Sequence, residues 1–584
     1  MEMEKKNLAI IILAIVLAAS GVGNVILGIQ SGFLQVVAPR KGGNLVVGAP
    51  QGDIVHLDPA YAYDSASINV IDQVVERLYW FDLADKEGGY PPVPALATAL
   101  PTISPNGLEY TIPIRQGVKF HDGTPLNASA VKWSFDRLQW FGNYSGNQYL
   151  PAPFNTPLPT SLPSGIPTPT QLWGAVYING DETPILNKTE VVDTYTIKMT
   201  LNQPRAAWFS IMCFCGSGIL SPSSTPANDY LTLSDDLVGT GPFIYDAFLA
   251  GSYIKLSSNP DYWQGQADLD TITVLILPDD IVASQALLSG DVDIVLAPNP
   301  AFLDQMSADP DVNLVYGGGT LRVSWVTFNY HLIPLTMRKA ISYCLNYSYI
   351  IDVVYDRVAV RWPTFIPMGI AFANYTLNYP TFDRAAARDL LLNDAYYGPL
   401  CAARNLTASS TDQDWLDVAA SNPLEAYNYT WNIGNTLRHG TGDRLAFDMP
   451  YIGCTLLVNG IAWGDMLGMM VSDREHLSLY QLGWLPDYQD PENYISAIWG
   501  NTSAINGGDY DQPDVMVLMA QGLTETDLTV RKHIYDEIQQ KMVERDFPGT
   551  PLVQTLDYDA FRTGVEGYIT NPIGNVWWYT VHFT

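Results

Sequence analysis

The chain has 584 residues, of which 47% are hydrophobic and only 15% charged, and 60 acidic residues against 30 basic ones give a formal net charge of −30. This length exceeds the roughly 250–300 residues at which a single core stops growing, so we expect at least two domains. The acidic balance argues against a nucleic-acid-binding protein, because phosphate binding requires clustered Lys and Arg. The ordinary apolar fraction argues against global disorder.

An apolar run from Leu8 to Ile29 follows Lys5 and Lys6 at the start of the chain. A positive segment followed by an apolar one is typical of an export signal. The run has about 22 residues, which is long enough to span a bilayer at 1.5 Å per residue. We therefore expect residues 8–29 to direct export and, if they are not cleaved, to anchor the chain with its lysines inside.

Eight Asn-x-Ser/Thr sequons support an exported chain, because each is a candidate glycan site on an exposed segment. Chance in an Asn- and Thr-rich sequence supplies some of them equally well. Together with the N-terminal run, they predict an extracytoplasmic protein at the cell surface. The sequons start at Asn127, Asn143, Asn187, Asn346, Asn374, Asn405, Asn428 and Asn501.

The five cysteines are sparse, and they allow at most two disulfides with one thiol left over. The sequence has no CxxC pair accompanied by a second CxxC or by HxxxH, so we expect no structural zinc site and no cofactor. It also has neither a GxSxG elbow nor an HExxH helix, which argues against a hydrolase.

Short strands and helices alternate along the first half of the chain. A strand is predicted at 45–49 and a strand and turn at 53–57, followed by a helix at 68–78, a β-hairpin region at 107–126 and a helix at 128–138 that Asn127 caps. Residues 151–170 contain seven prolines and predict a stiff, exposed loop.

The second half continues this mixture, which predicts α/β or α+β layers. Residues 402–435 are polar and lack a firm period, so we expect an inserted surface loop there. Strands are predicted at 195–201, 243–245, 253–257 and 271–277, and helices at 280–289, 335–356 and 383–392.

Seven ordered blocks resemble the extracytoplasmic solute-binding proteins of peptide-type ABC importers, solute-binding family 5. One such block is a weak signal, whereas this many in order are specific. They are LDPAYAYDSASINVIDQVVERLYWFD (57–82), VPALATALPTISPNGLEYTIPIRQGVKFHDGTPLNASAVKWSFDRL (93–138), VGTGPFIYDAFLAGSYIKLSSNPDYWQG (238–265), QALLSGDVDIV (285–295), TFNYHLIPLTMRKAISYCLNY (327–347), FDRAAARDLLLNDAYYG (382–398) and GWLPDYQDPENY (483–494).

The resemblance implies an α/β, two-lobed, periplasmic-binding-protein-like fold of type II, in the three-segment peptide-binding subclass, with a hinged cleft. Mapped by the blocks, domain I covers 43–78, 201–325 and 546–584, domain II covers 79–200, and domain III covers 326–545, after a signal or anchor segment and linker at 1–42. A ligand that contacts both lobes favours the closed state. The implied partner is the permease of an ABC transporter, which reads the closed form.

In peptide-binding relatives, the acid of the G-W-x-x-D pattern pairs with the α-ammonium of the ligand, and Asp487 stands at that position. Trp484 and Tyr488 beside it supply apolar area with a polar handle for the ligand. By contrast, Asp490 and Glu492 are expected to serve a turn and the surface. The alternatives are a solvated Asp487 between two turns, or one that bonds local backbone amides, and a core position for Trp484.

Three further expectations concern specificity and fold. The arginine that dipeptide binders use for the ligand carboxylate has no clear match, although Arg438 and Arg444 lie in the corresponding region. The stretches 115–122 and 239–243 are expected to form tight turns and a bend where chain approaches chain, not ligand sites. The same fold binding an oligosaccharide is the alternative function, and an extracellular hydrolase or a surface structural protein is less favoured.

Overall fold

The computed structural model describes residues 26–30, 33–37, 42–50, 54, 56–60, 62, 64–83, 91–142, 152–154, 184–501, 503, 505–525, 527–574 and 576–584. Asn143, residues 8–25 of the predicted anchor and most of the proline-rich loop lie outside these ranges. Residues Ile26–Gln30, at the end of the apolar run, form strand β1, which pairs antiparallel with β2 (Phe33–Val37). Within the described residues, none of the helices is both long and apolar enough to cross a membrane.

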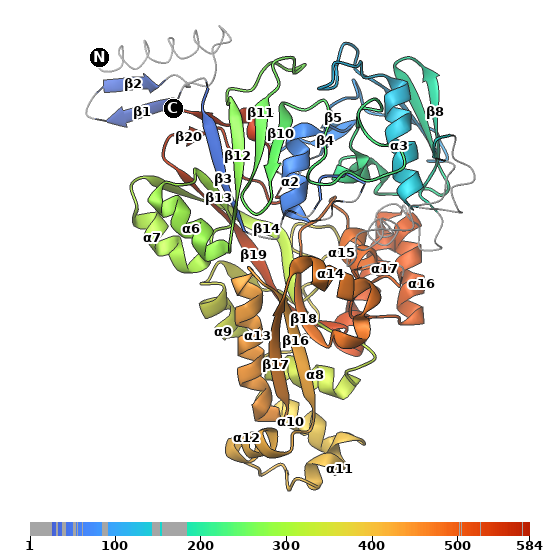
Figure 1. The fold of residues 1–584 in the computed structure, drawn as a ribbon. Helices are drawn as coiled ribbons and strands as arrows, with labels where there is room; N and C mark the ends of the chain where they lie inside the picture. Colours follow the sequence, from blue (N-terminus) through green and yellow to red (C-terminus); the bar gives the residue numbers. More distant parts are fainter. Residues whose placement is uncertain are drawn as a thin grey trace, which may run out of the picture.

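One sheet runs through the whole molecule and is covered by helices on its flanks (Figure 1). Most of its neighbours are distant in sequence, so the sheet holds both halves of the chain together. In spatial order the strands are β10 (Phe243–Leu249), β11 (Tyr253–Ser258), β12 (Thr271–Leu277), β3 (Asn44–Pro50), β13 (Ile294–Leu296), β19 (Gly549–Arg562), β14 (Val312–Phe328), β18 (Leu479–Trp484), β16 (Ala426–Asn432) and β17 (Thr455–Ile461), and β15 (Ala359–Arg361) pairs with β19.

Two long antiparallel strands, β14 and β19, carry the chain between two lobes (Figure 1). Their register runs from Val312 opposite Arg562 to Thr327 opposite Gly549, and it shifts between Gly319 and Val323. We call the elements before β14 and after β19 the first lobe, and the elements between these strands the second lobe. The irregular stretch of β14 therefore lies where one lobe passes into the other.

The first lobe contains the other predicted elements of the N-terminal half. The strand and helix predictions at 45–49, 68–78, 195–201, 253–257, 271–277 and 280–289 are confirmed with shifts of a few residues at the ends. Its helices are α2 (Ser65–Val74), α3 (Ala128–Gly142), α5 (Trp208–Ile211), α6 (Asp280–Ser289) and α7 (Leu303–Ala308), with 3-10 turns at Cys215–Ser217 (η2), Pro300–Phe302 (η3) and Trp578–Thr580 (η8). Its smaller sheets are β4 (Tyr79–Phe81) with β5 (Pro92–Pro94), β6 (Thr102–Ile103)-β7 (Glu109–Pro113)-β9 (Thr196–Leu201)-β8 (Leu186–Asp193), and β20 (Val565–Glu566) with β21 (His582–Phe583).

The predicted hairpin at 107–126 is wrong. Strand β7 pairs with β9, more than 80 residues away, and with the short β6. Residues 119 and 125 form only an isolated bridge. Alternating polarity indicates that a segment is a strand, but it does not select the partner strand. Here the distant strand β9 pairs with β7 over more residues than the neighbouring β6 does.

The second lobe holds most of the helices. The predicted long helix at 335–356 is broken, because Leu345 and Asn346 interrupt it and a turn with π-type hydrogen bonds follows. The helical elements are α8 (Leu335–Cys344), α9 (Tyr347–Tyr349), η4 (Ile350–Val354), α10 (Arg384–Asn393), α11 (Tyr397–Ala402), α12 (Asp412–Ser421), α13 (Thr436–Asp448), η5 (Met449–Ile452), α14 (Trp463–Ser472), η6 (Arg474–His476), α15 (Glu492–Trp499), α16 (Pro513–Thr524), α17 (Leu528–Gln540) and η7 (Lys541–Asp546).

The surface loop predicted at 402–435 is also wrong. Helix α12 begins with a capping box, in which Thr411 and Asp414 satisfy each other's backbone amides, and it buries Trp415, Val418 and Ala419 on one face. Strand β16 then enters the main sheet between β18 and β17. The many polar residues of this segment cap and flank these elements.

The glycines of the GTGPF bend confirm the prediction that chain approaches chain there. A Cβ on Gly239 would lie 2.0 Å from the carbonyl oxygen of Val74, and one on Gly241 would lie 2.5 Å from that of Gln73. The predicted turn at His121 docks on this bend, since its backbone amide donates to Gly239 O at 2.9 Å. Both motifs therefore build the first lobe, as expected.

A buried carboxylate, Glu76, holds this region together. It accepts hydrogen bonds from Thr240 Oγ1 at 2.7 Å, from Tyr262 Oη at 3.0 Å and from Trp263 Nε1 at 3.0 Å. Burial raises the pKa of Glu76 to about 7, although the three donors and nearby Arg115 oppose that shift. The loss of water around the carboxylate therefore outweighs its hydrogen bonds.

All five cysteines are buried free thiols. Five cysteines could form two disulfides, and neither is formed. Cys344 donates to the backbone oxygen of Asp448, and Cys454 contacts the sulfur of Met337. They pack as small apolar side chains.

We predict that Glu76 makes folding pH-dependent. Because its pKa is higher in the folded state than in the unfolded chain, it stabilises the fold most below pH 4.5 and loses this contribution as the pH rises through 7. Glu76→Gln should lower the free energy of unfolding at pH 5 by about 1–3 kcal/mol, because one donor loses its acceptor. At pH 8 the difference in the free energy of unfolding between parent and variant should be smaller by on the order of 2 kcal/mol, because the parent loses the contribution of Glu76 there. Urea unfolding measures both values. A deficit independent of pH would contradict the assignment.

Candidate functional site

The segment predicted to bind ligand joins strand β18 to helix α15, at the place where the lobes meet. Trp484 ends β18, and Glu492 begins α15. The neighbouring Leu485 lies so close to Gly574 of the first lobe that a Cβ on that glycine would stand 2.3 Å from it. The backbone of β14 is also near, because Tyr494 Oη donates to Leu321 O at 2.7 Å. Asp487 is therefore held beside both the other lobe and the crossing strand.

A buried amide, Asn493, fixes this loop. Its Oδ1 accepts from Trp484 Nε1 at 3.0 Å and from the backbone amide of Asp487 at 2.9 Å, and its Nδ2 donates to Asp487 Oδ2 at 2.8 Å. The Asn493 side chain is fully buried, whereas Asp487 is half-buried. The Asn493 side chain therefore orients the Asp487 carboxylate.

Sequence reasoning missed Asn493, although it lies within the GWLPDYQDPENY block. The available signal was its position, one residue into a helix that follows Pro491. Such a residue on the inner face of the first turn points back at the preceding loop, and Asn can donate to and accept from that loop at once.

The predicted surface role of Asp490 and Glu492 is wrong, although Asp490 does serve the helix entry, since it accepts from the backbone amide of Glu492 at 2.9 Å. Asp490 accepts two hydrogen bonds of 2.7 Å from the guanidinium of Arg531, and the Glu492 side chain is 0% exposed. Glu492 Oε1 accepts from Arg205 Nη2 at 2.9 Å and from Tyr488 Oη at 2.9 Å. The sequence did not reveal these arginine partners, because Arg531 lies 41 residues from Asp490 and Arg205 lies 287 residues from Glu492.

Burial raises the pKa of Glu492 above its usual value, and the guanidinium of Arg205 opposes this shift. Ionised Glu492 is compensated by two arginines, since Arg531 also lies 3.6 Å from its Oε2. Buried charges are tolerated only with such partners.

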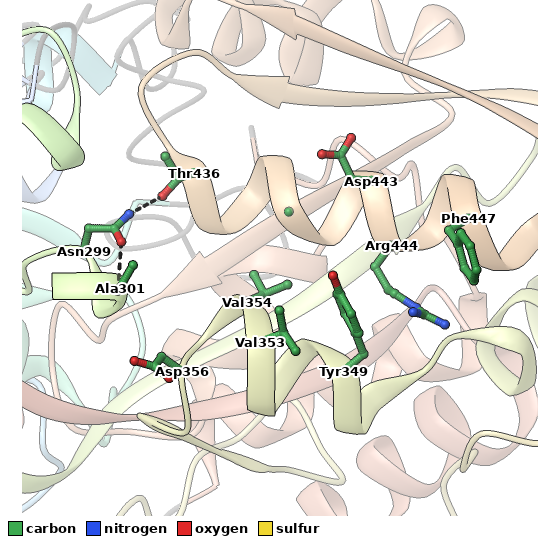
Figure 2. A pocket seen from close by; sticks show the side chains of 11 residues that line it. Asn299, Ala301, Tyr349, Val353, Val354, Asp356, Thr436, Asp443, Arg444 and Phe447 are labelled. Atoms are coloured by element: carbon green, nitrogen blue, oxygen red, sulfur yellow. Dashed lines mark hydrogen bonds between the residues drawn. The ribbon is translucent and has the colours of Figure 1, made fainter. Parts of the chain in front are cut away.

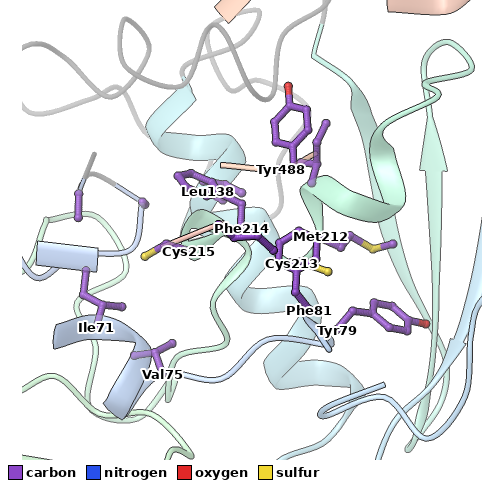
Figure 3. Close-up of a cluster of buried hydrophobic side chains, with 14 of the residues drawn as sticks. Ile71, Val75, Tyr79, Phe81, Leu138, Met212, Cys213, Phe214, Cys215 and Tyr488 are labelled. Carbon is purple, nitrogen blue, oxygen red and sulfur yellow. The ribbon is translucent and has the colours of Figure 1, made fainter. Parts of the chain in front are cut away.

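The two predicted aromatic ligand contacts differ in exposure. Tyr488 is fully buried, and Trp484 is 9% exposed. Figure 3 draws Tyr488 in a cluster with Leu138, Phe214 and Met212 of the first lobe. The ring of Tyr488 thus packs between the lobes in this arrangement, and direct ligand contact by Tyr488 and Trp484 stays a prediction.

The two arginines of the 424–457 region have different surroundings. Arg444 forms two hydrogen bonds with Asp448, at 2.8 Å and 2.5 Å, on the same helix. Arg438 lies near the carboxyl ends of the parallel strands β16 and β17, where it donates to Asn432 Oδ1 at 2.6 Å and stands 5.0 Å from the ring centre of Trp463. Ligands of open sheets bind at such strand ends, so Arg438 is better placed for a ligand than Arg444.

A cavity of about 740 Å³ lies where the first lobe meets helix α13 (Figure 2). Asn299 of the first lobe donates to Thr436 Oγ1 at 2.8 Å, and both donate to Asp280 Oδ2. Asn299 and Ala301 of the first lobe line the cavity together with residues of the second lobe that include Tyr349 and Arg444. The lobes are therefore in polar contact on this flank as well.

The predicted sequon asparagines fall into two groups in the described residues. Asn127, Asn346 and Asn374 are half-buried and accept hydrogen bonds from nearby backbone amides. The exposed ones are Asn187, Asn405, Asn428 and Asn501.

Residues 91–506 match the family model described as bacterial extracellular solute-binding proteins, family 5. The chain is 27% identical to heme-binding protein A of Haemophilus influenzae, over 88% of both chains, and 25% identical to a dipeptide-binding protein of Escherichia coli, over 94% and 96%. The fold is similar to that of an ABC transporter-associated periplasmic binding protein of Helicobacter pylori solved with the peptide STSA, with a TM-score of 0.77 and 24% identity, over 93% of this chain and 98% of that one.

We predict that Asn493 is the positioning residue of the Asp487 loop. Asn493→Ala removes three hydrogen bonds and leaves Trp484 Nε1 without that acceptor, so the free energy of unfolding should fall by about 2 kcal/mol or more. Asn493→Asp keeps the acceptor but places a second carboxylate beside Asp487, and it should be destabilising above pH 5 in particular. Chemical unfolding at two pH values tests both, with the exposed Asn501→Ala as control.

Proposed function

The chain belongs to the bacterial extracellular solute-binding proteins of family 5, and we propose that it captures a peptide between its lobes and delivers it to the permease of an ABC transporter. The observation that carries the proposal is the carboxylate of Asp487, oriented by Asn493 at the junction of the lobes. The dipeptide-binding relative and the peptide-bound neighbour support the same ligand class.

Asp487 suits the α-ammonium group of a peptide. A carboxylate forms a charge-assisted hydrogen bond with an ammonium and compensates its loss of water when the lobes close. A ligand without an amine would not form this charge-assisted hydrogen bond, so the same group would favour ligands that carry one. Trp484 would cover the first side chain of the peptide from β18.

The carboxylate of the peptide requires a cation farther along the cleft, and we propose Arg322 and Arg438 for it. Arg322 is half-buried on β14, in the stretch where the register with β19 shifts. Among the described residues, its guanidinium has no hydrogen-bond or ion-pair partner. Arg322 and Arg438 both lie near the buried Tyr355. Their positive charges each oppose the rise in the pKa of this tyrosine that burial causes. Two guanidiniums near one point favour an anion.

The domain limits follow the same proposal. Domain I comprises 43–78, 201–325 and 546–584, domain II comprises 79–200, and domain III comprises 326–545, so that domains I and II make up the first lobe. The ligand stabilises the closed lobes by its contacts with both. Residues 8–29 would hold the protein at the membrane and raise its effective concentration near the permease. Glycans on the exposed sequons would be compatible with this location.

Enzymatic activity forms no part of the proposal, since the matching family is described as solute-binding proteins. An oligosaccharide is the alternative ligand, because sugar rings stack on tryptophans such as the half-buried Trp463 and the more deeply buried Trp484. The similarity to a heme-binding protein makes hemin a further ligand to test.

We predict that Asp487→Asn weakens binding of a defined dipeptide about 10- to 100-fold, which corresponds to the loss of a charged hydrogen bond of about 1.5–3 kcal/mol. Calorimetry with alanyl-alanine and with a tryptic peptide pool measures this effect. Asp389→Asn, on the exposed face of α10, is the control and should bind as the parent does. Tight binding of N-acetylated peptides, maltodextrins or hemin in place of free peptides would overturn the proposal.

We further predict that Arg322→Met and Arg438→Met each weaken binding of peptides with a free carboxylate about tenfold, while amidated peptides change little. The exposed Arg357→Met is the matched control, since its side chain is 80% exposed. If both variants keep the preference of the parent for free over amidated peptides, neither arginine receives the carboxylate.

A further inference from the structure

A buried ion pair joins the two lobes directly. Arg205 belongs to the first lobe, between β9 and α5, and Glu492 begins α15 in the second lobe. Nε and Nη2 of Arg205 donate to Glu492 Oε1 at 3.1 and 2.9 Å, and the two side chains are 1% and 0% exposed. The only covalent connections between the lobes are β14 and β19, so this contact must break if the lobes separate.

Within the second lobe, Glu492 keeps other partners when Arg205 is absent. Tyr488 donates to its Oε1, and Arg531 lies 3.6 Å from its Oε2. Arg531 in turn is fixed by Asp490 and donates to Gly522 O. The acceptor for Arg205 is therefore prepared in the second lobe before closure.

Opening and closing of the lobes have opposite effects on the hydration of Arg205 and Glu492. With the lobes apart, both Arg205 and Glu492 can reach water. Closure removes both from water, and their mutual attraction offsets the cost of this desolvation. Such a pair adds little to closure when complete, but strongly disfavours closure when one partner is missing. It also demands correct alignment, because both nitrogens of Arg205 converge on one oxygen.

We propose that Arg205 and Glu492 form a lock between the lobes, which permits closure over the ligand only when the segment 487–493 is correctly placed. Since Asp487, Tyr488 and Glu492 share this segment, the packing that fixes Asp487 also fixes the acceptor of Arg205. Arg205 is thereby a positioning residue that raises ligand affinity without contacting ligand. This inference rests on the proposed capture of a ligand between the lobes.

A double-mutant cycle on the full chain tests the lock. The variants are Arg205→Met, Glu492→Gln and the double variant, each examined by small-angle scattering without ligand and by calorimetry with alanyl-alanine. Arg388→Met and Asp412→Asn form the control cycle, because this ion pair of 2.6 Å lies entirely within the second lobe.

Each single variant should fold, show a larger radius of gyration than the parent, and bind the dipeptide about tenfold or more weakly. The double variant should regain most of the affinity and compactness, because it leaves no unpaired buried charge. The control cycle should change neither quantity. Recovery of affinity and compactness in the double variant would distinguish a lock between the lobes from a contact that only stabilises the fold.

Three results would overturn the lock. Additive losses in the double variant would show that the two residues act independently. An unchanged radius of gyration in Arg205→Met would show that the pair does not restrain opening. Failure of Arg205→Met to fold would show that the contact is a permanent core contact, since lobes that open would let Glu492 hydrate. If no variant and not even the parent binds dipeptide, the proposed ligand fails, while the scattering comparison still decides the lock.

Discussion

The pairing of β14 with β19 is the constraint on which the rest of the molecule depends. These strands are hydrogen-bonded to each other over most of their length, yet they belong to both lobes. Their register shifts at three places, between Tyr316 and Gly318, between Gly319 and Val323, and between Ser324 and Trp325. The ladder is therefore interrupted along the stretch where one lobe passes into the other, while the sheet continues on both sides of this pair.

Charge is used sparingly, and part of it lies in the interior. With only 15% charged residues, the chain still buries Glu76, Asp490 and Glu492, each with several donors. Each of these carboxylates joins segments distant in sequence. Glu76 joins the end of α2 to the 240–263 region, Asp490 joins the loop before α15 to α17, and Glu492 joins α15 to the first lobe. A hydrogen-bonded buried charge tolerates few alternative arrangements, so these groups specify which segments meet. In this protein they specify both the fold of one lobe and the contact between the two.

The sequence predicts the elements well where a period or a motif is complete within one segment. Strands at 45–49 and 271–277 and the helix at 280–289 are of this kind, as is the bend at Gly239. It fails where the deciding partner is remote. The strand that pairs with β7, the arginines that neutralise Asp490 and Glu492, and the sheet that accepts β16 are all set by tertiary contacts that no local pattern encodes.

The same reasoning explains how the GWLPDYQDPENY block divides its roles. Of its three acids, Asp490 and Glu492 have arginine partners at 2.7 and 2.9 Å. Asp487 is instead aimed by the neutral amide of Asn493. Two acids therefore hold the segment to α17 and to the opposite lobe, and the third is presented at the junction in a fixed orientation. A rigid carboxylate loses little entropy when it binds a cation, so the burial of its two neighbours supports the proposed role of Asp487 as a ligand group.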